Sequence, residues 1–246
     1  MKNILIIFSL FAFNGLFGQK PIDLQIPANG STNISLSVKY PDVRIETWDQ
    51  NHIAITGTAM INHGQNDDSF ELVTQRNGNS IDIFSRINNY DQLPRKIQMW
   101  KDGQTYFFDT DDIKDDKVQE FRKQEGIKGY SHGVIVEINL VIKVPRKLKV
   151  EVEATYGMVE AVNISQDIRI NAKYGGLDLT VDGSGINEMT ARTRYGEIYS
   201  NLSVDFKSDD VNWDEPNKWT TVYTKGGKGY TFDLESQYGN IYLRKP

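Results

Sequence analysis

The 246-residue sequence contains no cysteine. Disulfides, thiol nucleophiles, thiolate metal ligands and a lipid-modified N-terminal cysteine are therefore excluded. Histidine is scarce as well: His52, His63 and His132 are the three copies, and none has a second histidine or a carboxylate at helical ligand spacing. The motifs of serine nucleophiles and of glycine-rich phosphate loops are also missing. We expect no catalytic residues, no metal and no cofactor.

Long apolar runs are absent beyond the N-terminus. Residues 4–13 form a short apolar run after a basic start, and small residues precede Gln19. This pattern predicts an export signal over residues 1–18, because the run is too short to span a bilayer comfortably. We expect an exported protein, periplasmic or extracellular, with no transmembrane span in the mature chain. The net charge of −5 disfavours nucleic acid as a partner.

A Tyr-Gly step recurs along the second half of the chain. Apolar residues lie six and four positions before each Tyr, and the apolar phase resumes three positions after it. Alternation with a period of two predicts strands, and the slip at glycine predicts a bulge or sharp corner, which glycine suits because it accepts a positive φ. A fifth, degenerate copy has Tyr40 before Pro-Asp. The predicted corner residues are Tyr40, Tyr156, Gly157, Tyr174, Gly175, Tyr195, Gly196, Tyr238 and Gly239.

The repeat predicts an all-β body. Its Tyr-to-Tyr spacings are 18, 21 and 43 residues, the last close to two periods with an insertion. Periods near 20 residues are typical of a β-solenoid or β-helix-like stack, in which each coil covers its neighbour and equivalent tyrosines lie above one another. A twisted β-sandwich is the alternative. We expect cross-strand ion pairs on the outer faces, where acidic residues alternate with Lys and Arg.

The chain divides into four predicted regions. Residues 1–18 are the signal peptide, 19–87 an N-terminal β-strand region, 88–132 a charged insertion, and 133–246 the Tyr-Gly repeat region. The insertion (the insert) is polar and has the one convincing helix-forming composition of the mature chain, so a short helix or a mobile loop is expected there. In residues 134–144, apolar residues occupy both odd and even positions, which predicts a strand that is buried on both faces.

Several motifs resemble those of a known family. They are Val144-Pro145, Tyr156-Gly157, the run from Tyr195 to Tyr199 and the closing run from Tyr238 to Lys245. Over residues 30–87 and 134–245 the chain resembles the exported, adhesin-like β-strand-repeat proteins of the DUF4097 type found in Bacteroidetes-like bacteria. The resemblance implies a right-handed β-solenoid-like fold in the cell envelope, with no established catalytic residues. The insert and the Pro41-Asp42 corner depart from that pattern.

Aromatic residues in irregular segments are the main functional signal. Trp100, Tyr106, Phe107, Trp213 and Trp219 could contact a partner or hold their loops on the body, whereas Trp48 follows a strand and is expected in the core. The leading interpretation is a non-enzymatic, adhesin-like envelope protein that offers an extended β surface to a protein or glycan, with weak homo-oligomers possible through edge strands. A carbohydrate-active enzyme with its site between body and insert, and a structural or stress-linked envelope protein without a specific ligand, are the alternatives.

Overall fold

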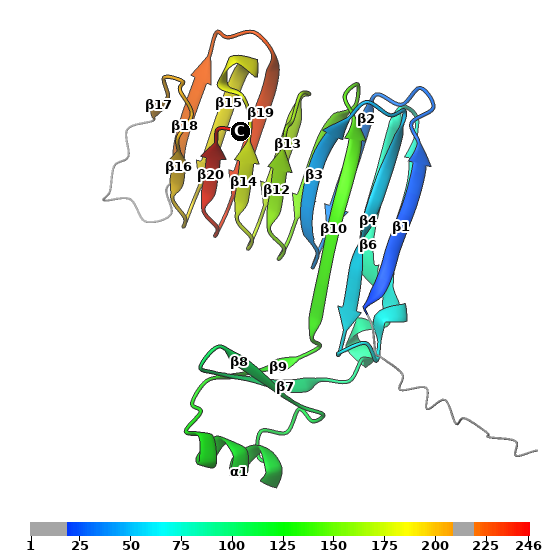
Figure 1. Cartoon of the computed structure of the whole chain (residues 1–246), viewed down its shortest axis with the longest axis vertical. Coiled ribbons are helices and arrows are strands. Elements are labelled where there is room, and N and C mark those ends of the chain that lie inside the picture. The colour runs from blue at the N-terminus through cyan, green and yellow to red at the C-terminus, as the bar shows by residue number, and fades with distance from the viewer. Residues whose placement is uncertain (1–18, 209–218) are drawn as a thin grey trace, which may run out of the picture.

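The computed structural model describes residues 19–208 and 219–246. The predicted signal peptide and Trp213 lie outside the described residues. The chain is all-β, with two large mixed sheets packed over one core and a small third sheet, with one α-helix beside it, below them (Figure 1). Inward-pointing Ile, Val and Leu of both large sheets are almost fully buried, which supplies the main hydrophobic stabilisation.

The elements are as follows. Sheet A has the order β1 (Lys20–Pro27), β4 (His52–Ile61), β10 (Val136–Pro145), β3 (Asp42–Trp48), β12 (Val159–Val162), β14 (Leu177–Thr180), β20 (Ile241–Arg244) and β16 (Ile198–Ser200). Sheet B has the order β17 (Lys207–Ser208), β18 (Thr220–Lys225), β15 (Ile186–Thr193), β19 (Tyr230–Ser236), β13 (Ile168–Ala172), β11 (Lys149–Ala154), β2 (Asn33–Val38), β6 (Ser80–Ile87) and β5 (Phe70–Asn77). Sheet C has the order β8 (Gln104–Phe108), β7 (Lys96–Lys101) and β9 (Tyr130–Gly133); the helix α1 is Asp116–Glu125, and 3₁₀ turns lie at Asp67–Ser69, Tyr90–Gln92 and Gly183–Gly185.

Each Tyr-Gly step, and the Tyr40-Pro41 step of the degenerate copy, is a corner at which the chain passes from sheet B to sheet A. The strand pairs joined in this way are β2–β3, β11–β12, β13–β14, β15–β16 and β19–β20. Equivalent strands pair in parallel, for example Val150 with Ile168 and Val159 with Leu177. The strand before the corner alternates strictly, with Val150, Val152 and Ala154 buried. The slip in apolar phase is therefore the change of sheet, as the repeat predicts.

The strand pairs joined at the corners, each called a coil below, do not follow one another in chain order. The last pair, β19–β20, lies between β13–β14 and β15–β16, and β18 covers the far side of β15 in antiparallel register. Strands β18 and β19 are consecutive in the chain but do not pair with each other, because β15 lies between them. Insertion of the final coil gives β15 a parallel partner and an antiparallel one, so its backbone groups are paired on both sides.

Two further expectations need correction. Strand β10 is buried on one face only: Ile138, Leu140 and Ile142 are buried, whereas Glu137 and Asn139 are exposed and Val141 is half-buried. Trp48 is also half-buried rather than in the core; its indole N–H donates to the carbonyl of His52 at 2.8 Å, since it lies at the end of β3. Strands β5 and β6 form a hairpin, with antiparallel pairing that runs up to Asn77 opposite Ser80.

The insert has a small core of its own. Helix α1 is capped at its start by Asp115, whose carboxylate accepts from the N–H groups of Lys117 and Val118, and at its end by Gly126, which has a φ of +67°. Residues Ile97, Met99, Val118 and Ile127 are buried together between sheet C and the helix. The helix is where its composition predicts it; the three strands beside it were not anticipated, because their apolar positions are few.

Candidate binding surface

The corner tyrosines form a continuous stack of rings, the tyrosine ladder. In spatial order its members are Tyr90, Tyr40, Tyr156, Tyr174, Tyr238 and Tyr195. Successive ring centroids lie 5.4, 5.5, 5.2, 5.1 and 4.8 Å apart, and the interplanar angles are 11–19°. These separations match the spacing of neighbouring strands, so the pairing of the coils sets the spacing of the rings. The predicted column of tyrosines is thus present, with Tyr238 inserted between Tyr174 and Tyr195.

A column of glycines lies behind the ladder and explains the Tyr-Gly pair. A Cβ on Gly157 would lie 1.7 Å from the carbonyl oxygen of Pro41, one on Gly175 2.0 Å from that of Gly157, and one on Gly239 2.4 Å from that of Gly175. The prediction that glycine serves these corners by adopting a positive φ is wrong, because none of the corner glycines has a positive φ. Glycine is required because the backbone of the next corner occupies the place of its side chain.

The ladder is exposed to solvent and bordered by cations. About half of Tyr156 and Tyr195 is exposed (51% each), and Tyr174 and Tyr238 are similar. Lys39, Lys173 and Arg194 each lie about 5 Å from the centroid of the ring that follows them. Because stacking covers the ring faces, the ladder presents ring edges and hydroxyls to a partner. Burial and a hydrogen bond with Tyr40 raise the pKa of Tyr90 to about 12.

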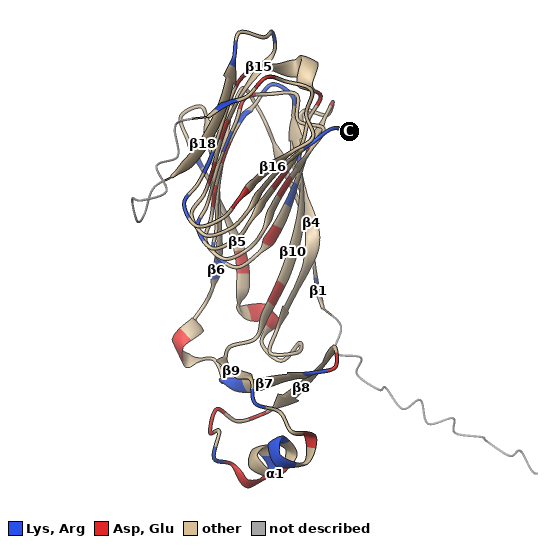
Figure 2. Ribbon diagram, turned by 90° about the vertical axis from the view of Figure 1, so that its left-hand side faces the viewer, with Lys and Arg blue, Asp and Glu red and all other residues tan. Residues whose placement is uncertain are grey.

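The outer faces of the sheets differ from the ladder. Basic and acidic residues are interspersed along the strands (Figure 2), and the expected cross-strand ion pairs are present. Arg192 Nε lies 2.6 Å from Glu235 Oε2, and Arg244 Nε lies 2.8 Å from Asp178 Oδ2. Each exposed pair contributes little to the stability of the fold, but the charged groups in it already have a partner. Among the described residues, the ladder is the longest continuous stack of aromatic rings.

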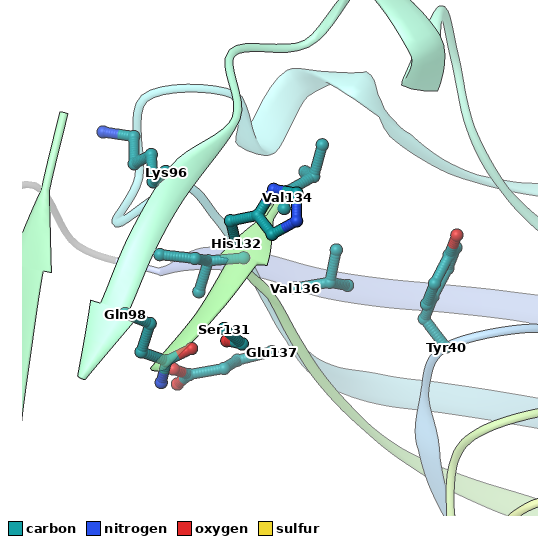
Figure 3. Close-up of a pocket in the computed structure, with 10 residues that line it drawn as sticks. Tyr40, Lys96, Gln98, Ser131, His132, Val134, Val136 and Glu137 are labelled. Carbon is teal, nitrogen blue, oxygen red and sulfur yellow. The ribbon is translucent and has the colours of Figure 1, made fainter. Parts of the chain in front are cut away.

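The ladder leads towards a cleft between the body and the insert. In Figure 1 the corners lie at the lower ends of the short sheet A strands, and the insert lies beneath them. A cleft of about 330 Å³ opens there, lined by Tyr40 from the ladder and by residues of β7, β9 and the start of β10. Figure 3 shows Gln98, Ser131 and Glu137 gathered on one side and Tyr40 opposite. An extended partner on the ladder would therefore reach the cleft at one end.

The insert is attached to the body through buried polar groups. Asn62 lies in the turn after β4 and is fully buried; its amide donates to the carbonyl of Pro94 at 2.9 Å and accepts from the N–H of Ile135 at 3.0 Å. Pro94 and Ile135 lie where the chain leaves for the insert and returns from it. The buried ammonium of Lys96 donates to Gln65 at 2.8 Å and pairs with Asp109. These bonds fix the position of the cleft wall.

The pair between Lys96 and Asp109 predicts a pH dependence. The hydrogen bond from Lys96, and then its charge, lower the pKa of the Asp109 carboxyl from 3.8. A carboxyl whose pKa is lower in the folded state stabilises that state above about pH 4, and the stabilisation is lost as pH falls through the folded pKa. Thermal unfolding of wild type and Asp109→Asn should differ in midpoint between pH 5 and 7 and converge near pH 2. A difference that does not change with pH would contradict this assignment.

The aromatic residues predicted from the sequence do not form one cluster. Trp100 is half-exposed and Phe107 lies beside the body, 3.8 Å in centroid distance from His63; Tyr106 points to the other side and packs on Phe121. Trp219 is half-buried just before β18, far along the chain from the insert. Phe107 therefore packs the insert against the body through His63, whereas the ring of Trp100 is exposed to solvent.

Sequence reasoning missed Tyr90 and the residues that line the cleft, although one alternative placed a site between body and insert. Tyr90 extends the ladder from a 3₁₀ turn without a following glycine, so no motif marks it. The cleft joins segments that are far apart in sequence, and Glu137 lay in a run that was assigned to a buried strand. In the sequence, the alternation of polar Glu137 and Asn139 with Ile138 and Leu140 indicates that one face of this strand is exposed to solvent.

In residues 19–208 and 219–246 no three His, Asp or Glu side chains converge as they would around a metal ion. Over the same residues, no helix has the length and the apolar character needed to cross a bilayer.

Comparison with known proteins identifies a shared fold. No protein-family model matches the sequence, and no curated protein matches it, so the resemblance to the DUF4097 type stays a prediction. A crystal structure of a protein from Clostridium sporogenes ATCC 15579, described as a "putative cell adhesion protein", matches with a TM-score of 0.51 and 11% sequence identity. The match covers 93% of this chain and 100% of the other. At this identity, the chain and the clostridial protein share a fold.

Proposed function

We propose that the protein is a non-enzymatic, exported, adhesin-like binding protein of the cell envelope, and that the tyrosine ladder is its main contact surface. The observation that carries the proposal is the stack of six rings, four of them exposed (Tyr156, Tyr174, Tyr238 and Tyr195), with Lys39, Lys173 and Arg194 along it. Tyrosine is enriched at binding interfaces because it offers apolar area and a hydroxyl at little conformational cost. The adhesion label of the clostridial protein agrees with this role.

The architecture suits such a role. We propose that the body is a solenoid-like stack of two-strand coils, right-handed as the family resemblance implies, into which the final coil has been inserted. Parallel pairing of five coils and one tyrosine per corner support this description over a twisted sandwich. A stack of this kind holds its corner residues at fixed spacing, so a flat or extended partner meets a preorganised row of side chains.

The enzymatic alternative places a site between body and insert, where the cleft lies. Glycoside cleavage uses two carboxyl groups across a groove, and Glu137 is the one carboxylate among the described residues that line this cleft. This count favours binding over catalysis. Incubation of the purified mature chain with envelope polysaccharides is expected to release no sugar; release that is lost in Glu137→Gln would support the enzyme instead.

A ladder variant tests the binding role. We expect the combined change of Tyr156, Tyr174 and Tyr238 to serine to weaken binding of the labelled protein to arrays of envelope proteins and glycans at least about tenfold, because interface tyrosines contribute much of the binding energy. The matched control changes three exposed tyrosines outside the ladder, Tyr199, Tyr223 and Tyr230, and should bind like wild type. A folded ladder variant with wild-type binding would favour a structural envelope protein without a specific ligand.

A further inference from the structure

One edge of β10 has no neighbouring strand at the cleft. Strand β10 pairs with β4 from Val136 to Lys143, whereas its pairing with β3 begins only at Asn139. Among the described residues, Val136–Ile138 thus have a partner strand on one side and none on the other. This open stretch lies directly below the corner of Tyr40, and Val136 and Glu137 line the cleft beside it.

The direction of the backbone groups on this stretch follows from its neighbours. The N–H of Ile135 donates to the Asn62 side chain at 3.0 Å, and its carbonyl accepts from the Asn62 N–H at 2.9 Å. Because successive residues of a strand direct their N–H and C=O to opposite sides, Val136 and Ile138 direct theirs away from β4. The parallel pairing of Asn139 with Asp42 occupies the Ile138 carbonyl, so the groups left on the open side are the N–H and C=O of Val136 and the N–H of Ile138. A row of donors and acceptors with this spacing is what another extended backbone matches.

The side chains around the open edge are also uncommitted. Within the described part of the chain, Gln98, Ser131 and Glu137 make no hydrogen bond or ion pair with another side chain, and Figure 3 shows them side by side. Glu137 points outward from the sheet and is exposed. A carboxylate beside an open edge favours a basic residue on a strand that pairs there.

We propose that the open edge of β10 at Val136–Ile138 binds an extended peptide segment of a partner protein by strand addition, with a Lys or Arg of that peptide beside Glu137. The inference rests on the binding role proposed above and names the class of partner. Main-chain pairing would supply affinity, and Glu137, Gln98 and Ser131 would select side chains. A glycan fits less well, because stacking on Tyr90 and Tyr156 leaves neither face of Tyr40 free for a sugar.

The test uses two synthetic heptapeptides of alternating threonine and valine, one with a central lysine and one with a central glutamate. In fluorescence anisotropy at low salt, wild type should bind the lysine peptide about threefold more tightly than the glutamate peptide. Glu137→Lys should reverse this preference, whereas Glu151→Lys, an exposed carboxylate on β11, should leave it unchanged. Val136→Pro, which removes one outward N–H at an edge where proline is tolerated, should weaken both peptides at least about tenfold.

Hydrogen exchange locates the contact independently of these variants. The amides of Val136 and Ile138 should gain protection when the lysine peptide is added, even if Val136→Pro fails to fold. The inference is overturned if neither peptide binds wild type, if Glu137→Lys leaves the preference unchanged, or if protection appears elsewhere. If the peptide experiments fail while the ladder variant still loses binding to the arrays, the strand-addition site alone is wrong; if both fail, the binding role is wrong as well.

Discussion

Gly175→Ala should lower the free energy of unfolding by about 3 kcal/mol or more, the upper range for overpacking a core. Gly175 lies in the middle of the glycine column, and an added Cβ would lie 2.0 Å from the carbonyl oxygen of Gly157. That oxygen belongs to backbone that is held by neighbouring coils, so the clash cannot be relieved by rotating a side chain. Chemical denaturation followed by tyrosine fluorescence measures the difference.

The matched control for this change is Gly185→Ala. Gly185 also lies in the body and has no positive φ, and its added Cβ would meet no atom within 4 Å. We expect its unfolding free energy to stay within about 0.5 kcal/mol of wild type, as for surface changes away from special features. Equal stability of the two variants would show that the corners do not approach one another as described.

Asn62→Ala should destabilise the protein by about 2–4 kcal/mol, because each buried polar group left unpaired costs about 1–3 kcal/mol. The change removes the side-chain partners of the Pro94 carbonyl and of the Ile135 N–H. It should also loosen the insert, so the Ile135 amide should exchange with solvent faster than in wild type. Denaturation and hydrogen exchange of the same samples give both results.

Asn89→Ala is the control for this variant. It measures the cost of placing alanine at a positive φ without the loss of the side-chain hydrogen bonds that Asn62 makes. Asn62 and Asn89 have nearly the same positive φ, 51° and 52°, but Asn89 is exposed and its side chain makes no capping bond. An alanine at either position carries the same conformational cost, about 1 kcal/mol. We expect Asn89→Ala to show this cost alone. A comparable loss in the two variants would contradict the role of Asn62 at the junction.

The strands were predictable because local alternation decides them. Val150, Val152 and Ala154 point inward in the structure as their spacing requires, and the change of sheet falls at the Tyr-Gly step. The order of the coils was not predictable. The corners at Tyr195 and Tyr238 have the same local pattern, and the choice between them is made by pairing of strand edges far apart in sequence.

The surface features depended on long-range contacts and were predicted only in part. The ladder followed from the repeat, but Tyr90 joined it through a turn that carries no repeat pattern. Adjacent Tyr106 and Phe107 were treated as one aromatic group, although neighbours on a strand point to opposite sides. The cleft brings together Tyr40, Gln98 and Glu137 from three segments, and their proximity is a property of the fold rather than of any motif.

The continuity and order of the tyrosine ladder are tested most directly by disulfide formation between paired cysteines. The protein has no cysteine, so introduced pairs report without interference. Tyr174→Cys with Tyr238→Cys places the two cysteines on neighbouring coils with their Cα atoms roughly 4.8 Å apart, within the Cα range that a disulfide spans. Tyr174→Cys with Tyr195→Cys places them two strands apart, roughly 9.6 Å, beyond that range. Under mild oxidation the first pair should form a disulfide and the second should not; cross-linking of the second pair in preference to the first would contradict the ladder.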